Sequence, residues 1–129
     1  MCVVKLLSRE MSRFSGKVLF VTGAARGLGL AIVERFLSEG AKVLAFDVDG
    51  ALLTTIFSSN ANVMIASGDV RSREAVQAGV DAAVSAWGRI DVLANVAGVA
   101  QEVHFLDITP DDFSRIIDIN LTGECLQAR

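Results

Sequence analysis

The stretch "TGAARGLG", residues 22–29, places three glycines directly after the apolar run "VLFV" at residues 18–21. Glycine adopts backbone conformations that other residues rarely adopt, and it leaves room for other groups near the backbone. We expect Gly23 to allow a tight turn. Gly27 and Gly29 are expected to let another group approach the backbone and to let the following helix pack close to the strand. The stretch therefore predicts a strand, a turn and a helix in succession.

The position of this turn favours a ligand site. Open α/β sheets bind ligands at the carboxyl ends of their strands, and the free N–H groups of a helix N-terminus attract an anion such as a pyrophosphate. The glycines follow the spacing GxxxGxG, whereas GxGxxG would need glycine or alanine at Ile32. A glycine-rich turn that serves packing alone is the alternative interpretation.

Short apolar runs alternate with stretches of helical periodicity along the chain. The runs at residues 17–22, 42–47, 62–67 and 91–96 have the length of strands that are buried on both faces. Helices are predicted at residues 28–38, 50–59 and 72–87. In the helix at residues 28–38, Leu28, Ile32 and Phe36 lie on one face. In the helix at residues 72–87, one face holds Val76, Val80, Ala83, Val84 and Trp87. This alternation predicts an α/β fold, a parallel sheet with helices on both faces.

Composition limits the possible partners. A chain of 129 residues with 52% hydrophobic residues and one proline can bury a single core. A net charge of −3 offers no basic surface to nucleic acid or to an anionic membrane, and no window approaches the ~18 apolar residues of a membrane span. Cys2 and Cys125 are too isolated to predict a disulfide framework or a metal site. We therefore expect a cytoplasmic protein with a small-molecule ligand.

The second predicted strand ends in an acidic residue, Asp47, which lies 18 residues after Gly29. A dinucleotide-binding unit places an acid near this position to bind the adenosine ribose hydroxyls. That carboxylate would repel a 2′-phosphate, which favours NAD over NADP. Arg26 in the glycine-rich loop is the counterargument, because a guanidinium could accept that phosphate. A strand-end turn residue is the structural alternative for Asp47.

Five motifs in order resemble the short-chain dehydrogenase/reductase family. They are "TGAARGLG", Asp47, "DV" at residues 69–70, "NVAG" at residues 95–98 and "DINLTG" at residues 118–123. The resemblance covers residues 14–129, with residues 1–13 as an N-terminal extension. It implies a Rossmann-like NAD(P)-binding domain whose strands have the order 3-2-1-4.

The resemblance also implies roles for particular residues. The glycine-rich loop would contact the cofactor through Gly23, Arg26, Gly27, Leu28 and Gly29. Asp69 and Val70 would hold the adenine ring, and the fourth strand would be stabilised beside the cofactor by Asn95, Ala97 and Gly98. Val96 replaces the second asparagine of the commoner "NNAG".

Asn120 stands out in the last predicted helix. Thr109 can serve as its N-cap, with Asp112 in the capping-box position. Asn120 then shares an apolar face with Phe113, Ile116 and Ile117, where a buried amide needs partners. The alternatives are a structural asparagine bonded to neighbouring backbone and, by resemblance, the asparagine of the family's catalytic tetrad.

The family's catalytic tyrosine and lysine have no counterpart here. The chain contains no tyrosine, and Lys5, Lys17 and Lys42 all precede the fifth motif. We therefore expect the N-terminal half of an NAD-dependent oxidoreductase that acts on an alcohol or a ketone. The chain by itself is expected to transfer no hydride and to form homo-oligomers. The alternative is a natural short protein that binds a dinucleotide or a protein partner without catalysis.

Overall fold

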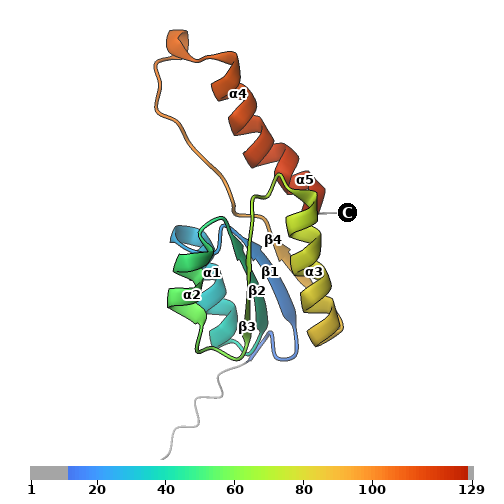
Figure 1. The fold of residues 1–129 in the computed structure, drawn as a ribbon. Coiled ribbons are helices and arrows are strands. Elements are labelled where there is room, and N and C mark those ends of the chain that lie inside the picture. The colour runs from blue at the N-terminus through green and yellow to red at the C-terminus, as the bar shows by residue number, and fades with distance from the viewer. Residues whose placement is uncertain (1–11, 128–129) are drawn as a thin grey trace, which may run out of the picture.

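The computed structural model describes residues 12–127, which form a four-stranded parallel sheet with helices on both faces (Figure 1). The strand order is β3-β2-β1-β4, as predicted. The strands are β1 Val18–Thr22, β2 Lys42–Asp47, β3 Val63–Ser67 and β4 Val92–Ala94.

The helices lie in two groups around this sheet. In Figure 1, α1 and α2 lie on one side of the sheet and α3 lies on the other. Helix α4, a π-helical turn η2 and a short α5 follow one another directly, after a short 3₁₀ helix η1. Their bounds are α1 Gly27–Ser38, α2 Gly50–Phe57, α3 Arg73–Trp87, η1 Phe105–Asp107, α4 Pro110–Ile117, η2 Asp118–Gly123 and α5 Glu124–Gln127.

The two hydrophobic clusters follow from the alternation of side chains along the strands. Leu19 and Val21 of β1 join Val33 of α1 and Leu53 of α2 on one face. On the other face of the sheet, Phe20 of β1 packs with Leu44 and Phe46 of β2 and with Val76 and Ala83 of α3. The central strands β1 and β2 are buried on both faces, as predicted, but the outer strands β3 and β4 are only half-buried because each has one strand neighbour.

The predicted helix ends are confirmed where a cap defines them. Ser72 accepts a hydrogen bond from the Ala75 N–H at the start of α3, and Gly88 ends that helix at φ +79°. Thr109 and Asp112 form a capping box at the start of α4.

Two residues of the predicted packed faces are exposed instead. Leu28 is 69% exposed and Val84 is 42% exposed. Leu28 lies in the first turn of α1, beyond the end of β1, so the sheet does not cover it. Gly79 of α3, which the apolar periodicity does not mark, is buried against Ala66 of β3.

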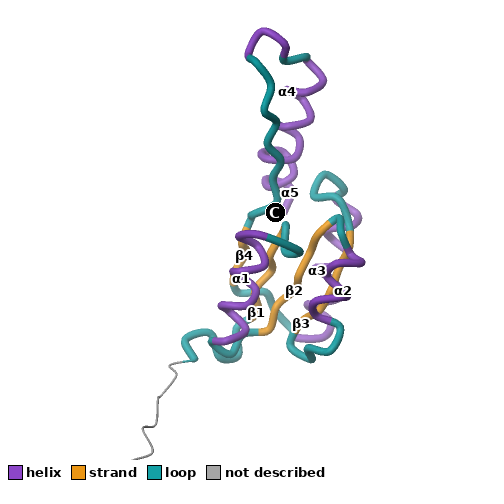
Figure 2. Tube along the Cα trace, turned by 90° about the vertical axis from the view of Figure 1, so that its left-hand side faces the viewer, coloured by secondary structure: helices purple, strands orange, loops and turns teal. Residues whose placement is uncertain are grey.

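Helix α4 extends away from the sheet, as both views show (Figures 1 and 2). None of its residues is buried, and Phe113 is 62% exposed. The apolar face that the sequence predicts for this helix is therefore only partly covered in the described part of the chain, since Ile116 and Ile117 are half-buried and Phe113 is exposed.

The segment before β1 contacts the end of α1. Phe14 stacks on Phe36 with ring centroids 4.1 Å apart, and Arg13 forms an ion pair with Glu39. Most of the predicted N-terminal extension, with Cys2, lies outside the described residues, and the domain boundary after residue 13 stays a prediction.

Candidate functional site

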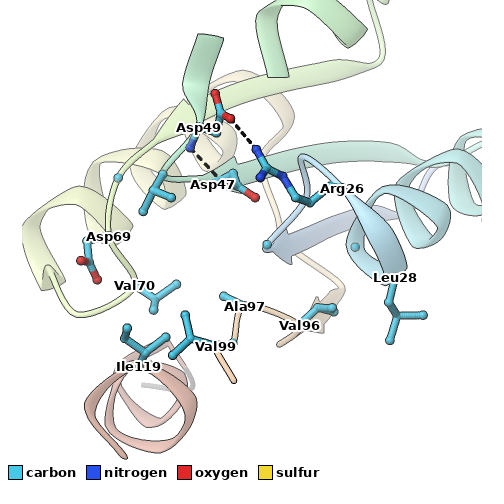
Figure 3. A pocket seen from close by; sticks show the side chains of 15 residues that line it. Arg26, Leu28, Asp47, Asp49, Asp69, Val70, Val96, Ala97, Val99 and Ile119 are labelled. Carbon is cyan, nitrogen blue, oxygen red and sulfur yellow. Dashed lines mark hydrogen bonds and ion pairs between the residues drawn. The ribbon is translucent and has the colours of Figure 1, made fainter. Parts of the chain in front are cut away.

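A cavity of about 660 Å³ lies at the carboxyl ends of the strands (Figure 3). Nine of the eleven residues predicted to bind the cofactor line it: Gly23, Arg26, Leu28, Gly29, Asp47, Asp69, Val70, Ala97 and Gly98. Gly27 and Asn95 do not line it. Asp47, Asp49 and Arg26 lie together on one side in Figure 3, and Val70, Val99 and Ile119 gather on another.

Each glycine of the loop meets a different physical requirement. A Cβ on Gly29 would lie 1.9 Å from the Gly23 carbonyl oxygen, so the close approach of α1 to the turn requires glycine, as predicted. Gly23 combines a φ of +64° with a contact in which a Cβ would come 2.9 Å from the Ala97 backbone. Gly27 has a φ of +54° and open space around it, so its backbone conformation is what favours glycine.

The N-terminus of α1 differs from those of the other long helices. Asp49, Ser72 and Thr109 cap α2, α3 and α4 through their side chains. Within residues 12–127 no side chain caps α1, and its first turn holds no acidic residue. The N–H groups of that turn, beside the cavity-lining Gly29, therefore remain available to an anion.

Asp47 lies at the end of β2 with both carboxylate oxygens engaged by backbone. One oxygen accepts the Ala25 N–H at 3.0 Å, and the other accepts the Asp49 N–H at 2.9 Å. These bonds orient the carboxylate beside the glycine-rich loop. An ionised carboxylate offers about four acceptor sites, so acceptor capacity remains for hydroxyl donors.

Arg26 is not a free cation in this structure. Its guanidinium forms an ion pair with Asp49, which lies two residues beyond the end of β2. Figure 3 shows this pair beside Asp47. Asp49 was not predicted, because a carboxylate in the turn "DVDG" carries no signal that distinguishes it from a helix cap.

Asp69 and Val70 follow β3 and line the cavity from the side opposite Arg26 (Figure 3). The Arg71 side chain donates to both carboxylate oxygens of Asp69, at 2.6 Å and 3.0 Å for the two nearest contacts. The hydrogen bonds from Arg71 lower the pKa of the Asp69 carboxyl, against the effect of burial. Val70 is 5% exposed and presents an apolar surface.

The residues after β4 are held against β1 by a side chain that sequence reasoning missed. The buried Thr22 hydroxyl oxygen accepts the backbone N–H groups of Val96 at 3.1 Å and Ala97 at 3.2 Å. The predicted strand to residue 96 therefore ends earlier, at Ala94, because these amides bond a side chain instead of a strand. Asn95 points elsewhere: its amide donates to the Glu124 carbonyl at 3.4 Å.

Asn120 lies in the π-helical turn η2, which the sequence did not predict. Its side chain oxygen accepts the Val99 N–H at 2.8 Å, and its amide nitrogen donates to the Val99 carbonyl at 2.9 Å. The expectation of a buried amide is wrong, because Asn120 is exposed at this end of the domain. The partners are nevertheless those of a structural asparagine bonded to neighbouring backbone.

Six cavity residues were not predicted: Val48, Asp49, Gly68, Val96, Val99 and Ile119. Val99 and Ile119 come together through the bonds between Asn120 and the Val99 backbone, a contact across 21 residues that no local periodicity reveals. Gly68 is required by packing, since a Cβ there would lie 2.6 Å from the Ala75 side chain.

A parallel sheet with a glycine-rich turn after its first strand and an acid at the end of its second defines the class of dinucleotide-binding α/β domains. The short chain dehydrogenase family model matches residues 17–129. The chain therefore belongs to the short chain dehydrogenase family.

Relatives of known name match the chain over most of its length. A versicolorin reductase of Emericella nidulans is 33% identical over 127 residues, which cover 95% of this chain and 48% of that protein. A galactitol 2-dehydrogenase of Agrobacterium fabrum is 39% identical and covers 86% of this chain and 44% of that protein. This chain thus spans about half the length of the curated relatives it matches.

A solved structure also matches most of the chain. A 3-ketoacyl-(acyl-carrier-protein) reductase from Brucella melitensis complexed with NADH has a TM-score of 0.84 and 30% identity, over 90% of this chain and 48% of that one.

In residues 12–127, no helix has the length and apolar character needed to cross a membrane.

Proposed function

We propose that this domain binds NAD in preference to NADP, as the cofactor-binding part of an oxidoreductase that acts on an alcohol or carbonyl group. The observation that carries this proposal is the placement of the Asp47 carboxylate beside the uncapped N-terminus of α1, at one cavity. The NADH in the Brucella melitensis reductase supports a nicotinamide cofactor here too, because that protein has the same fold.

The residues of the cavity fit such a cofactor. Within residues 12–127 no side chain caps the first turn of α1, so N–H groups of that turn can bind a pyrophosphate, and Asp47 retains acceptor sites for a ribose diol. Val70 offers apolar surface to an adenine ring, next to Asp69. When bound, a nicotinamide cofactor supplies the hydride donor or acceptor.

The residues after β4 have a positioning role in this proposal. Thr22 holds the backbone of Val96 and Ala97, and Asn120 holds the backbone of Val99 from both sides. Val99 and Ile119 then limit the access of water to this side of the cavity. Asn120 acts through Val99 and is a positioning residue in this chain.

No tyrosine is present in the 129 residues to donate a proton to a carbonyl oxygen. This favours a second candidate function for the chain by itself, which is dinucleotide binding without catalysis. For the whole protein we propose a small alcohol or ketone as the substrate and the cytoplasm as the location.

Replacement of Asp47 by alanine tests the proposed cofactor preference. We expect the unmodified chain to bind NAD⁺ more tightly than NADP⁺ in calorimetric titrations. Asp47→Ala should lower the ratio of NAD⁺ affinity to NADP⁺ affinity about tenfold, or about 1.4 kcal/mol. The reason is that it removes both the acceptor for the ribose hydroxyls and the repulsion of a 2′-phosphate.

Asp81→Ala is the matched control, because it removes the same charge from the exposed side of α3, away from the cavity. It should leave the preference unchanged. Tighter binding of NADP⁺ by the unmodified chain would contradict the proposed preference, and no binding of either dinucleotide would contradict the proposed function.

A further inference from the structure

The ion pair between Arg26 and Asp49 joins two segments that border the cavity. Arg26 belongs to the glycine-rich loop, and Asp49 lies between β2 and α2. The Arg26 Nη2 atom lies 2.5 Å from Asp49 Oδ2. Both residues line the cavity, and Figure 3 shows the pair adjacent to Asp47.

Asp49 is fixed by two further hydrogen bonds. Its other oxygen accepts the Leu52 N–H at 3.1 Å and caps α2, while its own N–H donates to Asp47 at 2.9 Å. The carboxylate therefore has a defined position at the start of a helix. Arg26 is 68% exposed, so its long side chain depends on Asp49 for its orientation.

We propose that Asp49 is a second determinant of cofactor choice, which holds the Arg26 guanidinium in an ion pair and so withholds it from a 2′-phosphate. The inference rests on the proposed dinucleotide binding, and it adds to the role of Asp47. Asp47 disfavours the phosphate by its own charge, whereas Asp49 acts by occupying the one cation that lines the cavity in the described part of the chain.

The chemistry of Arg26, Asp47 and Asp49 supports these separate roles for the two carboxylates. A guanidinium binds phosphate through paired N–H donors, so a free Arg26 would favour NADP⁺. With Asp49 in place, a 2′-phosphate would have to displace a carboxylate from Arg26 and remain close to two negative charges. An exposed ion pair contributes little to stability, so its effect is expected on ligand choice.

The substitution Asp49→Asn tests this inference in the full 129-residue chain. Asparagine caps helices as well as aspartate does, so α2 keeps its N-cap while Arg26 loses its anionic partner. We expect the ratio of NAD⁺ affinity to NADP⁺ affinity, measured by calorimetry, to fall about tenfold. The fall in this affinity ratio should be smaller at high salt, because salt screens the attraction between the solvent-exposed Arg26 guanidinium and the 2′-phosphate.

Two further variants separate the release of Arg26 from a simple loss of charge. In the Arg26→Gln background, Asp49→Asn should change the affinity ratio by about twofold or less, since no guanidinium is left to release. Asp81→Asn, on the exposed side of α3, should leave the ratio unchanged.

The outcomes distinguish the inference from the proposed function. If the unmodified chain prefers NAD⁺ and Asp49→Asn shifts the ratio equally with and without Arg26, the inference is overturned and the proposed function stands. An unchanged ratio in Asp49→Asn also overturns the inference alone. If neither dinucleotide binds to the unmodified chain, the proposed function and the inference fail together.

Discussion

At the scale of single residues, Glu39 shows how one buried carboxylate connects the start of the domain to its first helix. Glu39 is 6% exposed at the end of α1 and forms ion pairs with Arg13 and Arg35. The hydrogen bond from Arg13 is the largest effect that lowers the pKa of the Glu39 carboxyl to about 2, and Arg35 adds to it. Arg13 thereby ties the segment before β1 to the domain.

This depressed pKa makes the free energy of unfolding depend on pH. A carboxyl whose pKa is lower in the folded state stabilises the fold above its unfolded pKa, and that contribution is lost as pH falls through the folded value. We expect the Glu39 contribution to be complete above pH ~4.5 and to disappear progressively towards pH ~2. Urea unfolding of the unmodified chain and of Glu39→Gln, between pH ~2 and ~4.5, measures the contribution of Glu39 to the free energy of unfolding.

The difference in unfolding free energy between these two proteins should therefore shrink as the pH falls from 4.5 towards 2. Comparing the two proteins cancels the other carboxyls with lowered pKa values, such as Asp69, Asp91 and Asp112. Glu34→Gln, on the exposed side of α1, is the matched control, because it replaces the same kind of carboxyl on the same helix and leaves the ion pairs of Glu39 in place. A difference that stays constant over this range would contradict the role given to Glu39.

At the scale of secondary structure elements, the contact between β1 and the residues after β4 depends on one hydroxyl group. Thr22 is fully buried, and its oxygen accepts two backbone N–H groups, from Val96 and Ala97. Valine has the same shape as threonine but no acceptor, so Thr22→Val leaves both donors without this partner. We expect a loss of about 2 kcal/mol in the free energy of unfolding.

Thr22→Ser is the matched variant, because it keeps the acceptor and loses one methyl group, at a cost of about 1 kcal/mol. Amide exchange at Val96 and Ala97 should accelerate in Thr22→Val and remain slow in Thr22→Ser. Equal stability and equal exchange in the two variants would show that these amides do not depend on the hydroxyl.

Thr22 also illustrates what the sequence could and could not predict. Local patterns sufficed for the four strands, for the helix caps at Ser72 and Thr109, and for the glycine turn, because each depends on residues close in the chain. The strand order came from the resemblance to a family. The bonds from Thr22 to Val96 and from Asn120 to Val99 join residues 74 and 21 positions apart, and no periodicity encodes such pairs.

The limit of local patterns also explains why the predictions for Leu28 and Asn120, which are both exposed, were wrong. Leu28 has the spacing of a packed residue, but the strand below it has already ended at Thr22. The π-helical turn at residues 118–123 shifts the register of the last helix, so Asn120 leaves the face that α-helical spacing assigns to it. π-Helical turns occur frequently at functional sites, which agrees with this turn, because its own residue Ile119 lines the cavity.

At the scale of the whole molecule, two features of the described chain lack partners, a strand edge and a group of exposed apolar side chains. Among residues 12–127, β4 pairs only with β1, so its other edge presents unpaired backbone groups. The η1 and α4 segment carries exposed apolar side chains, with Phe105 and Leu106 each 81% exposed and Phe113 62% exposed. Exposed apolar patches and free strand edges both promote association.

We therefore predict that the 129-residue chain self-associates, and that the exposed face of α4 contributes to the contact. Phe113→Glu places a charge in the middle of that face and should shift the chain towards the monomer, because burial of the carboxylate in an apolar contact would be unfavourable. Size-exclusion chromatography with light scattering at several concentrations measures the change in mass.

Ser114→Glu is the matched control, since it adds the same charge at the next, exposed position of the same helix. Both variants introduce glutamate, which is a good helix former, so neither should unfold the helix. Ser114→Glu should associate as the unmodified chain does. If Phe113→Glu and Ser114→Glu retain the same mass, the contact runs through another surface, and the free edge of β4 becomes the next one to test. A monomeric unmodified chain at all concentrations would contradict the prediction as a whole, because the exposed apolar side chains of the η1 and α4 segment would then be stable in water.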